Sequence, residues 1–195
     1  MIKGLISVII PCKDRDSIEP FCLRSLEDQI FKNFEIIIKE GTQVCVNRNN
    51  GAREAQGEYL FFCDNDIDLK DDCLYRMYDA LEKNPDCDFA YCRFYKTGEI
   101  TGLQESRPWD FEALKKQNFV STMSLIRASK FPGFREDLER FHDWDLYLRI
   151  AENGSKGYYI PDPLFTAVYK SGGISTNKEN YTRCQQRIKN LHNIK

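Results

Sequence analysis

The segment Leu5-Ile6-Ser7-Val8-Ile9-Ile10-Pro11 decides the fold, because it is a short apolar run that ends at a proline. A continuous run of this length is typical of a strand that is buried on both faces of a parallel sheet. Two further apolar runs follow, at residues 34–38 and 59–63, and a helical pattern lies between successive runs. This alternation predicts parallel pairing with right-handed crossovers, and therefore an α/β fold.

The rest of the chain shows similar patterns. A helix is expected after Ser17, which would cap it, with Pro20 tolerated in the first turn. The other predicted helices are 45–55, 71–83, 110–116 and 143–152. The other predicted strands are 88–95, 120–126, 158–160 and 165–169, with a turn at 96–99.

The composition is that of a globular protein, with 42% hydrophobic and 30% charged residues. The net charge of -2 offers no basic excess to neutralise phosphates, so nucleic acid is not an expected partner. The eight cysteines form no Cys-x-x-Cys pair, so we interpret them as small core residues of a reducing compartment in preference to a zinc or disulfide framework. No apolar run has the length of a transmembrane segment, which predicts a cytoplasmic protein that could still visit a membrane surface.

Polar residues follow three of the predicted strands, where ligands bind in open parallel sheets. These strand ends are residues 11–15, 39–42 and 64–68. The third is the most informative, because Asp64 and Asp66 offer the hard oxygen ligands that Mg²⁺ and Mn²⁺ prefer. From these residues alone, a metal site and a solvated acidic turn are equally good interpretations.

A second acidic cluster, Phe141-His142-Asp143-Trp144-Asp145, opens a predicted amphipathic helix. Asp143 could cap this helix or act as a general base, and taken alone the pattern favours the cap. A helix N-terminus lowers the pKa of a carboxyl group, whereas neighbouring acidic residues raise it, and the sequence leaves this competition open. Arg48, on the second predicted helix, is either part of a polar face or a contact to a nucleotide base.

The order of these segments resembles glycosyltransferase family 2. The motifs that carry the resemblance are, in chain order, Ser7-Val8-Ile9-Ile10-Pro11, Phe34-Glu35-Ile36-Ile37-Ile38, Arg48-Asn49-Asn50-Gly51, Ala55-Gln56-Gly57-Glu58-Tyr59, Asp64-Asn65-Asp66, residues 121–127, Gly133-Phe134, residues 143–149, Tyr169-Lys170 and Ile174-Ser175. The resemblance implies a GT-A (Rossmann-like) α/β fold, with a mostly parallel central sheet flanked by helices and a small antiparallel addition in the acceptor half. It implies a single domain over residues 1–177, divided into a nucleotide-sugar-binding half (1–95) and an acceptor half (96–177). Residues 178–195 are expected to be a polar C-terminal helix or tail.

Carried over by position, the resemblance implies a role for each motif. Asp66 would bind Mn²⁺ or Mg²⁺, Asp64 would bind the ribose or the metal through water, and Asp143 would be the catalytic base. The residues expected around the nucleotide sugar are Pro11, Lys13, Asp14, Arg15, Glu40, Arg48, Asp64, Asn65 and Asp66. The implied reaction is inverting hexosyl or pentosyl transfer from a UDP-, dTDP- or GDP-linked sugar to a hydroxyl of a glycan, glycoprotein or lipid-linked acceptor.

Three departures from the family pattern bear on this interpretation. The second strand ends in Lys39-Glu40 where paired aspartates are usual, and the connection from there to Arg48 is short. Ser171-Gly172-Gly173 stands where the family often has a histidine that can reach the metal. These departures favour the alternative of a catalytically weak sugar-nucleotide-binding module in a larger assembly. A nucleotidyltransferase is not favoured, because the loop at residues 11–14 contains no glycine.

Overall fold

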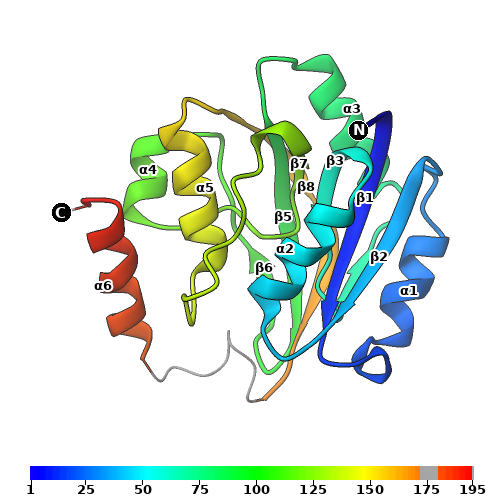
Figure 1. The fold of residues 1–195 in the computed structure, drawn as a ribbon, viewed down its shortest axis with the longest axis horizontal. Helices are drawn as coiled ribbons and strands as arrows, with labels where there is room; N and C mark the ends of the chain where they lie inside the picture. Colours follow the sequence, from blue (N-terminus) through cyan, green and yellow to red (C-terminus); the bar gives the residue numbers. More distant parts are fainter. Residues whose placement is uncertain (172–179, 195) are drawn as a thin grey trace.

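The computed structural model describes residues 1–171 and 180–194. The strands in this part of the chain are β1 (Ile2–Cys12), β2 (Phe34–Glu40), β3 (Gly57–Phe62), β4 (Ile67–Leu69), β5 (Phe89–Gly98), β6 (Gly102–Gln104), β7 (Leu125–Arg127) and β8 (Gly157–Tyr169). The helices are α1 (Pro20–Glu27), α2 (Val44–Glu54), α3 (Cys73–Lys83), α4 (Phe111–Lys116), α5 (His142–Glu152) and α6 (Tyr181–Leu191), with 3₁₀ turns η1 (Arg15–Ser17) and η2 (Ala128–Lys130). Figure 1 shows the strands together at the centre and α4, α5 and α6 grouped at one side.

The strands form one sheet in the order β2-β1-β3-β7-β5-β8-β4, with β6 added beside β5. The long ladders are parallel and join β1 to β2, β1 to β3, and β5 to β8. The antiparallel ladders are short and join β7 to its two neighbours, β6 to β5, and β4 to β8. The structure confirms the predicted α/β class, with a mostly parallel sheet and a small antiparallel part.

Apolar side chains pack on both faces of the sheet. On β3, Tyr59 and Phe61 join a cluster with α1 and α3, while Leu60 and Phe62 join a second cluster with α4, α5 and α6. Because successive residues of a strand point to opposite faces, a strand buried on both sides is continuously apolar. All eight cysteines are free thiols and seven are buried, as expected of small core residues.

Several predicted boundaries were wrong. β8 is one strand where two were predicted, because it runs through Pro161 and Pro163 with a register shift against β5. β7 has only three residues, since the hydroxyls of Ser121 and Ser124 bind the local backbone in place of a ladder. β5 continues through the predicted turn to Gly98. Ser17 does not cap α1: Glu19 stands at that position, and Ser17 ends η1.

Helix α2 lies unusually close to the sheet at Gly51. A Cβ atom built on Gly51 would lie 2.4 Å from Cγ2 of Ile9, in the buried centre of β1. The glycine of the Arg48-Asn49-Asn50-Gly51 motif therefore lets α2 approach β1, and this fixes the place of Arg48 on the same helix.

We expect Gly51→Ala to lower the free energy of unfolding by about 1–3 kcal/mol, because the added methyl group overpacks against Ile9. Elsewhere in a helix the same change commonly stabilises a protein by about 0.4–1 kcal/mol. Urea unfolding measures the difference, with Asn50→Ala as the control on a half-exposed position of α2. A Gly51→Ala protein as stable as the wild type would contradict the close approach.

Candidate active site

A cleft of about 350 Å³ lies at the carboxyl ends of β1 and β2. Three residues predicted from the sequence line it: Pro11, Lys13 and Asn65. Asn47, from α2, joins the two strand ends, because its Nδ2 donates to the carbonyl oxygens of Cys12 at 3.1 Å and Gly41 at 2.9 Å. The cleft therefore has a wall that is fixed by hydrogen bonds between strand ends and helix.

Four charged residues at the first two strand ends, Asp14, Arg15, Lys39 and Glu40, do not line this cleft. Lys39 Nζ lies 2.5 Å from Glu54 Oε1 on α2, so its charge is directed at that helix. Arg15 Nε lies 3.3 Å from Glu40 Oε1. The Asp14 carboxylate accepts from the backbone N–H of Ser17 and caps η1. Lys39 thus places no uncompensated charge where the nucleotide is expected.

The turn that follows β3 carries Asp64, Asn65 and Asp66 and is held from two sides. Asn65 Nδ2 donates to the Ser17 carbonyl oxygen at 2.6 Å, and the N–H of Glu19 donates to the Asn65 carbonyl oxygen at 3.0 Å. The N–H of Val168 donates to the carbonyl oxygen of Asp66 at 3.2 Å. The loop after β1 and the end of β8 therefore fix the backbone of the acidic turn.

Arg48 is a buried side chain of α2 and does not line the cleft. Its Nη2 donates to Asp64 Oδ1 at 2.5 Å, and its guanidinium lies 5.2 Å from the centre of the Phe134 ring. Burial opposes the charged form, but the carboxylates of Asp64 and Asp143 raise the pKa of Arg48. Arg48 therefore connects the acidic turn after β3 with the segment that carries Asp143.

Asp66 is an unusual carboxyl group. Burial and the charge of Asp64 raise the pKa of Asp66 to about 6, against the opposing charge of Lys170. Two neighbouring carboxylates of this kind repel one another, and a bound cation would relieve the repulsion. No cluster of three or more His, Cys, Asp or Glu side chains that could hold a metal is found within residues 1–171 and 180–194. The two carboxylates of Asp64 and Asp66 nevertheless fit Mg²⁺ or Mn²⁺, because these ions bind through one or two carboxylates together with substrate phosphates.

Asp143 lies in the first turn of α5 and is not its N-cap. That position belongs to Phe141, which has a left-handed backbone with φ 61°. Asp143 Oδ1 accepts from the N–H of Trp144 at 2.8 Å. Burial raises the pKa of Asp143, and it outweighs this hydrogen bond and the charges of His142 and Arg48. The pKa of Asp143 is therefore raised, as a general base requires, but by burial and not by the neighbouring acidic residues considered from the sequence.

His142 serves the structure of this segment. Its Nε2 lies 2.8 Å from the Leu138 carbonyl oxygen, and burial lowers the pKa of its imidazole. The ring is therefore engaged with the backbone of its own segment.

The sequence matches known proteins of one family. The glycosyl transferase family 2 model matches residues 39–141, more than half of the 195 residues. The chain belongs to glycosyl transferase family 2. The matched span contains Arg48, Asp64 and Asp66, and it ends two residues before Asp143.

Two relatives of this family 2 chain come from bacteria. An uncharacterised glycosyltransferase of Haemophilus influenzae is 26% identical over 90% of the chain and 73% of its own length. The GalNAc(5)-diNAcBac-PP-undecaprenol beta-1,3-glucosyltransferase of Campylobacter jejuni is 24% identical over 80% of the chain and 62% of its own length.

Solved structures show the same fold. Residues 1–349 of S. aureus TarS, in complex with UDP-GlcNAc, superpose with a TM-score of 0.73 at 16% identity. The match covers 94% of the family 2 chain and 65% of that structure. The mannosyltransferase PcManGT of Pyrobaculum calidifontis, in complex with GDP-Man and Mn²⁺, gives 0.61 at 17% identity over 87% and 58% of the two chains. The fold is therefore GT-A, and the chain spans less than two thirds of both solved proteins.

The closing segment of the family pattern is described only in part. Lys170 forms an ion pair with Glu19, and Tyr169 ends β8. Gly172, Gly173 and the Ile174-Ser175 pair lie outside the described residues.

Two residues beside the carboxylates had no role in the sequence-based prediction: Tyr169, which was quoted only as part of a motif, and Asn118. Burial raises the pKa of Tyr169, and the charges of Asp143, Asp66 and Asp64 raise it further. The phenol of Tyr169 therefore lies within electrostatic reach of all three carboxylates. The side chain of Asn118 lies against the Asp143 carboxylate and lowers its pKa. The Tyr169-Lys170 motif is the sequence signal for Tyr169, and Asn118 has none.

We expect Arg48→Met to raise the pKa of Asp143 further, because it removes one of the charges that lower it. A titration of the Asp143 carboxyl carbon by ¹³C NMR measures the change. Arg53→Met, on the exposed side of the same helix, is the control. An Asp143 pKa that is unchanged or lower in Arg48→Met would show that Arg48 does not act on this carboxyl group.

Proposed function

We propose that this chain is an inverting glycosyltransferase that moves a sugar from a nucleoside-diphosphate sugar to an acceptor hydroxyl. One observation carries the proposal: Asp64 and Asp143, 79 positions apart in the sequence by their numbering, both lie within the electrostatic reach of the buried Arg48. Asp64 and Asp66 follow β3, at the edge of the sheet where ligands of α/β proteins bind.

The cleft beside Pro11, Lys13 and Asn65 is the proposed place of the nucleotide. Structures of the same fold were solved with UDP-GlcNAc and with GDP-Man and Mn²⁺, which supports a UDP- or GDP-linked donor. A dTDP-linked donor is proposed on the family resemblance alone. Asp66, assisted by Asp64, would hold Mg²⁺ or Mn²⁺. When bound, such a cation supplies positive charge that favours departure of the diphosphate.

Asp143 is the proposed general base. It takes the proton of the acceptor hydroxyl while the hydroxyl oxygen bonds to the anomeric carbon and the bond to the diphosphate breaks. A single displacement of this kind inverts the anomeric configuration. The raised pKa of Asp143 suits the role, because a base is most effective when its pKa lies near the working pH.

The acceptor is proposed to be a glycan, glycoprotein or glycolipid, and the transferred sugar a hexose or pentose. The name of the Campylobacter relative describes an undecaprenol-linked acceptor, which supports a lipid-linked one here. None of the helices in the described residues has the length and composition to span a bilayer. We propose that the chain acts in the cytoplasm and meets such an acceptor at the membrane surface.

We expect Asp143→Asn to retain donor binding and to slow the Mn²⁺-dependent release of nucleoside diphosphate by about 10²–10⁴-fold. The amide keeps the shape of the side chain but cannot accept the proton. The assay follows hydrolysis of UDP-glucose, UDP-N-acetylglucosamine and GDP-mannose, with Asp68→Asn as the exposed control. Donor binding without any release that depends on Asp143 would favour the sugar-nucleotide-binding module instead.

We expect Asp66→Ala to weaken donor binding when Mn²⁺ is present and to change it little when Mn²⁺ is absent. The reason is that the alanine removes the carboxylate proposed to share the cation with the donor phosphates. Isothermal titration calorimetry with each of the three donors measures both conditions. Unchanged Mn²⁺-dependent binding in Asp66→Ala would remove Asp66 from the proposed metal site.

A further inference from the structure

Helix α6 packs against the segment that carries Asp143. Ile188 of α6 is fully buried in the same apolar cluster as α5. The ring of Tyr181, at the start of α6, meets the ring of Phe141 edge-on at 5.1 Å. Arg183 and Arg187 of α6 form ion pairs with Glu139 and Asp137. The C-terminal helix is therefore docked along residues 137–141, directly before the base.

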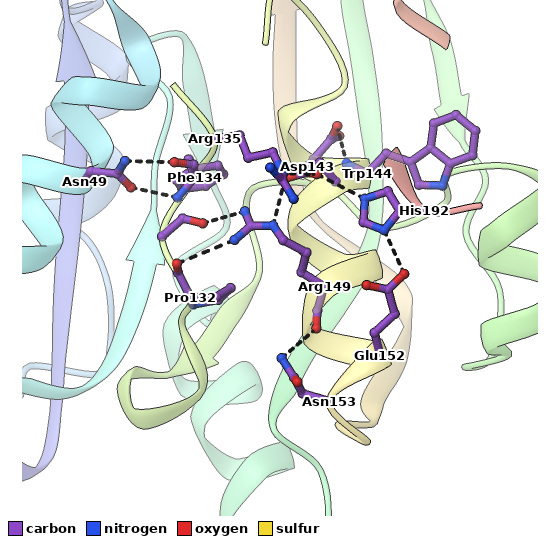
Figure 2. A network of polar contacts seen from close by, with 12 residues as sticks. Asn49, Pro132, Phe134, Arg135, Asp143, Trp144, Arg149, Glu152, Asn153 and His192 are labelled. Atoms are coloured by element: carbon purple, nitrogen blue, oxygen red, sulfur yellow. Dashed lines mark hydrogen bonds and ion pairs between the residues drawn. The ribbon is translucent and has the colours of Figure 1, made fainter. Parts of the chain in front are cut away.

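His192 follows α6 and is almost completely buried, with 2% of its side chain exposed. Its Nε2 lies 3.0 Å from Asp145 Oδ1 and its Nδ1 lies 2.7 Å from Glu152 Oε1. Figure 2 shows the imidazole of His192 beside α5, with Glu152 below it and Asp143 and Trp144 above. Since each ring nitrogen faces a carboxylate oxygen, only the imidazolium donates to both. Burial opposes that form, but the two hydrogen bonds raise the pKa of His192.

Asp145 receives this contact in a fully buried position two residues after Asp143. Its carboxylate also accepts from Arg135 Nε at 3.0 Å and from Arg149 Nε at 2.9 Å. Arg149 in turn donates to the Gly133 carbonyl oxygen, so the network reaches the loop before α5 (Figure 2). A buried carboxylate is costly in free energy unless it has partners of this kind. Together these partners fix the first turn of α5.

The first turn needs such support because the chain enters it through a strained residue. Phe141 is a bulky residue in the left-handed region, which costs on the order of 1–3 kcal/mol and persists only where the surroundings impose it. The C-terminal segment contacts this entry at two points: Tyr181, at the start of α6, meets Phe141, and His192, directly after α6, meets Asp145.

We propose that His192 is a positioning residue for the base: by holding Asp145 from the C-terminal helix, it fixes the turn of α5 that presents Asp143. The expected effect on turnover rests on the proposed function, whereas the role of His192 in fixing this turn does not. A displacement of about 1 Å at a reacting group can cost about 10²-fold in rate, so loss of this contact acts on turnover more than on donor binding.

The test compares His192→Ala with Arg187→Ala, which removes an exposed ion pair from the same helix. Amide hydrogen exchange by NMR reports the turn directly, because the Trp144 N–H donates to Asp143 Oδ1. We expect His192→Ala to speed exchange at Trp144 by at least about 10-fold and to lower kcat for donor hydrolysis by about 10- to 100-fold, with the donor KM unchanged. Arg187→Ala should resemble the wild type in both.

Wild-type exchange at Trp144 in His192→Ala would overturn the inference. So would an equal effect of Arg187→Ala. If His192→Ala does not fold, His192→Gln and His192→Asn decide: the Gln amide nitrogen can reach Asp145 as Nε2 does, whereas the Asn amide reaches only Glu152. Protection and kcat retained with Gln and lost with Asn support the inference, and equal behaviour of the two overturns it.

If the wild type releases no nucleoside diphosphate from any of the three donors, the proposed function fails, and the exchange at Trp144 still decides the role of His192.

Discussion

The site depends on the burial of the Arg48 guanidinium within reach of two carboxylates from distant parts of the chain. A buried guanidinium needs carboxylate partners, and Asp64 and Asp143 supply them. Gly51 allows the helix of Arg48 to lie against β1, so the position of the charge is set by packing in the sheet. The charge of Arg48 also lowers the pKa of Asp143, although burial raises this pKa by more. The turn after β3 and the first turn of α5 are thus joined through one buried cation.

The parallel half of the fold was predictable because its signal is local. A strand buried on both faces reads as a continuous apolar run, and β1 and β3 lie where such runs predicted them. β2 also lies where its apolar run predicted a strand, although it is the half-exposed edge strand of the sheet. β8 was not predictable as a single strand, because Pro161 and Pro163 read as its boundary, whereas the register shift against β5 accommodates them. The short β7 depends on side chains that compete for the backbone at Ser121 and Ser124, which periodicity does not detect.

The candidate residues of the site also carry local signals, and their roles stay predictions. Asp64, Asp66 and Asp143 could be singled out, because each stands at the end of a strand or the start of a helix. The partners of these and neighbouring residues could not, because they lie on other elements, which only the tertiary packing brings together. Lys39 pairs with Glu54 of α2, Arg48 pairs with Asp64, and His192 reaches Asp145 over 47 positions. These pairings direct Lys39 at α2, connect Arg48 with the acidic turn, and join His192 to α5.

The central claim is that the acidic turn after β3 and the cleft beside it form a nucleotide site completed by a divalent cation. The most direct measurement is a crystal structure of the chain grown with Mn²⁺ and UDP or GDP, with the anomalous scattering of manganese recorded. The account predicts one manganese peak bonded to the Asp66 carboxylate and to the diphosphate, with the nucleoside between Pro11 and Asn65. A nucleotide bound elsewhere, or manganese bound without contact to Asp66, would contradict it.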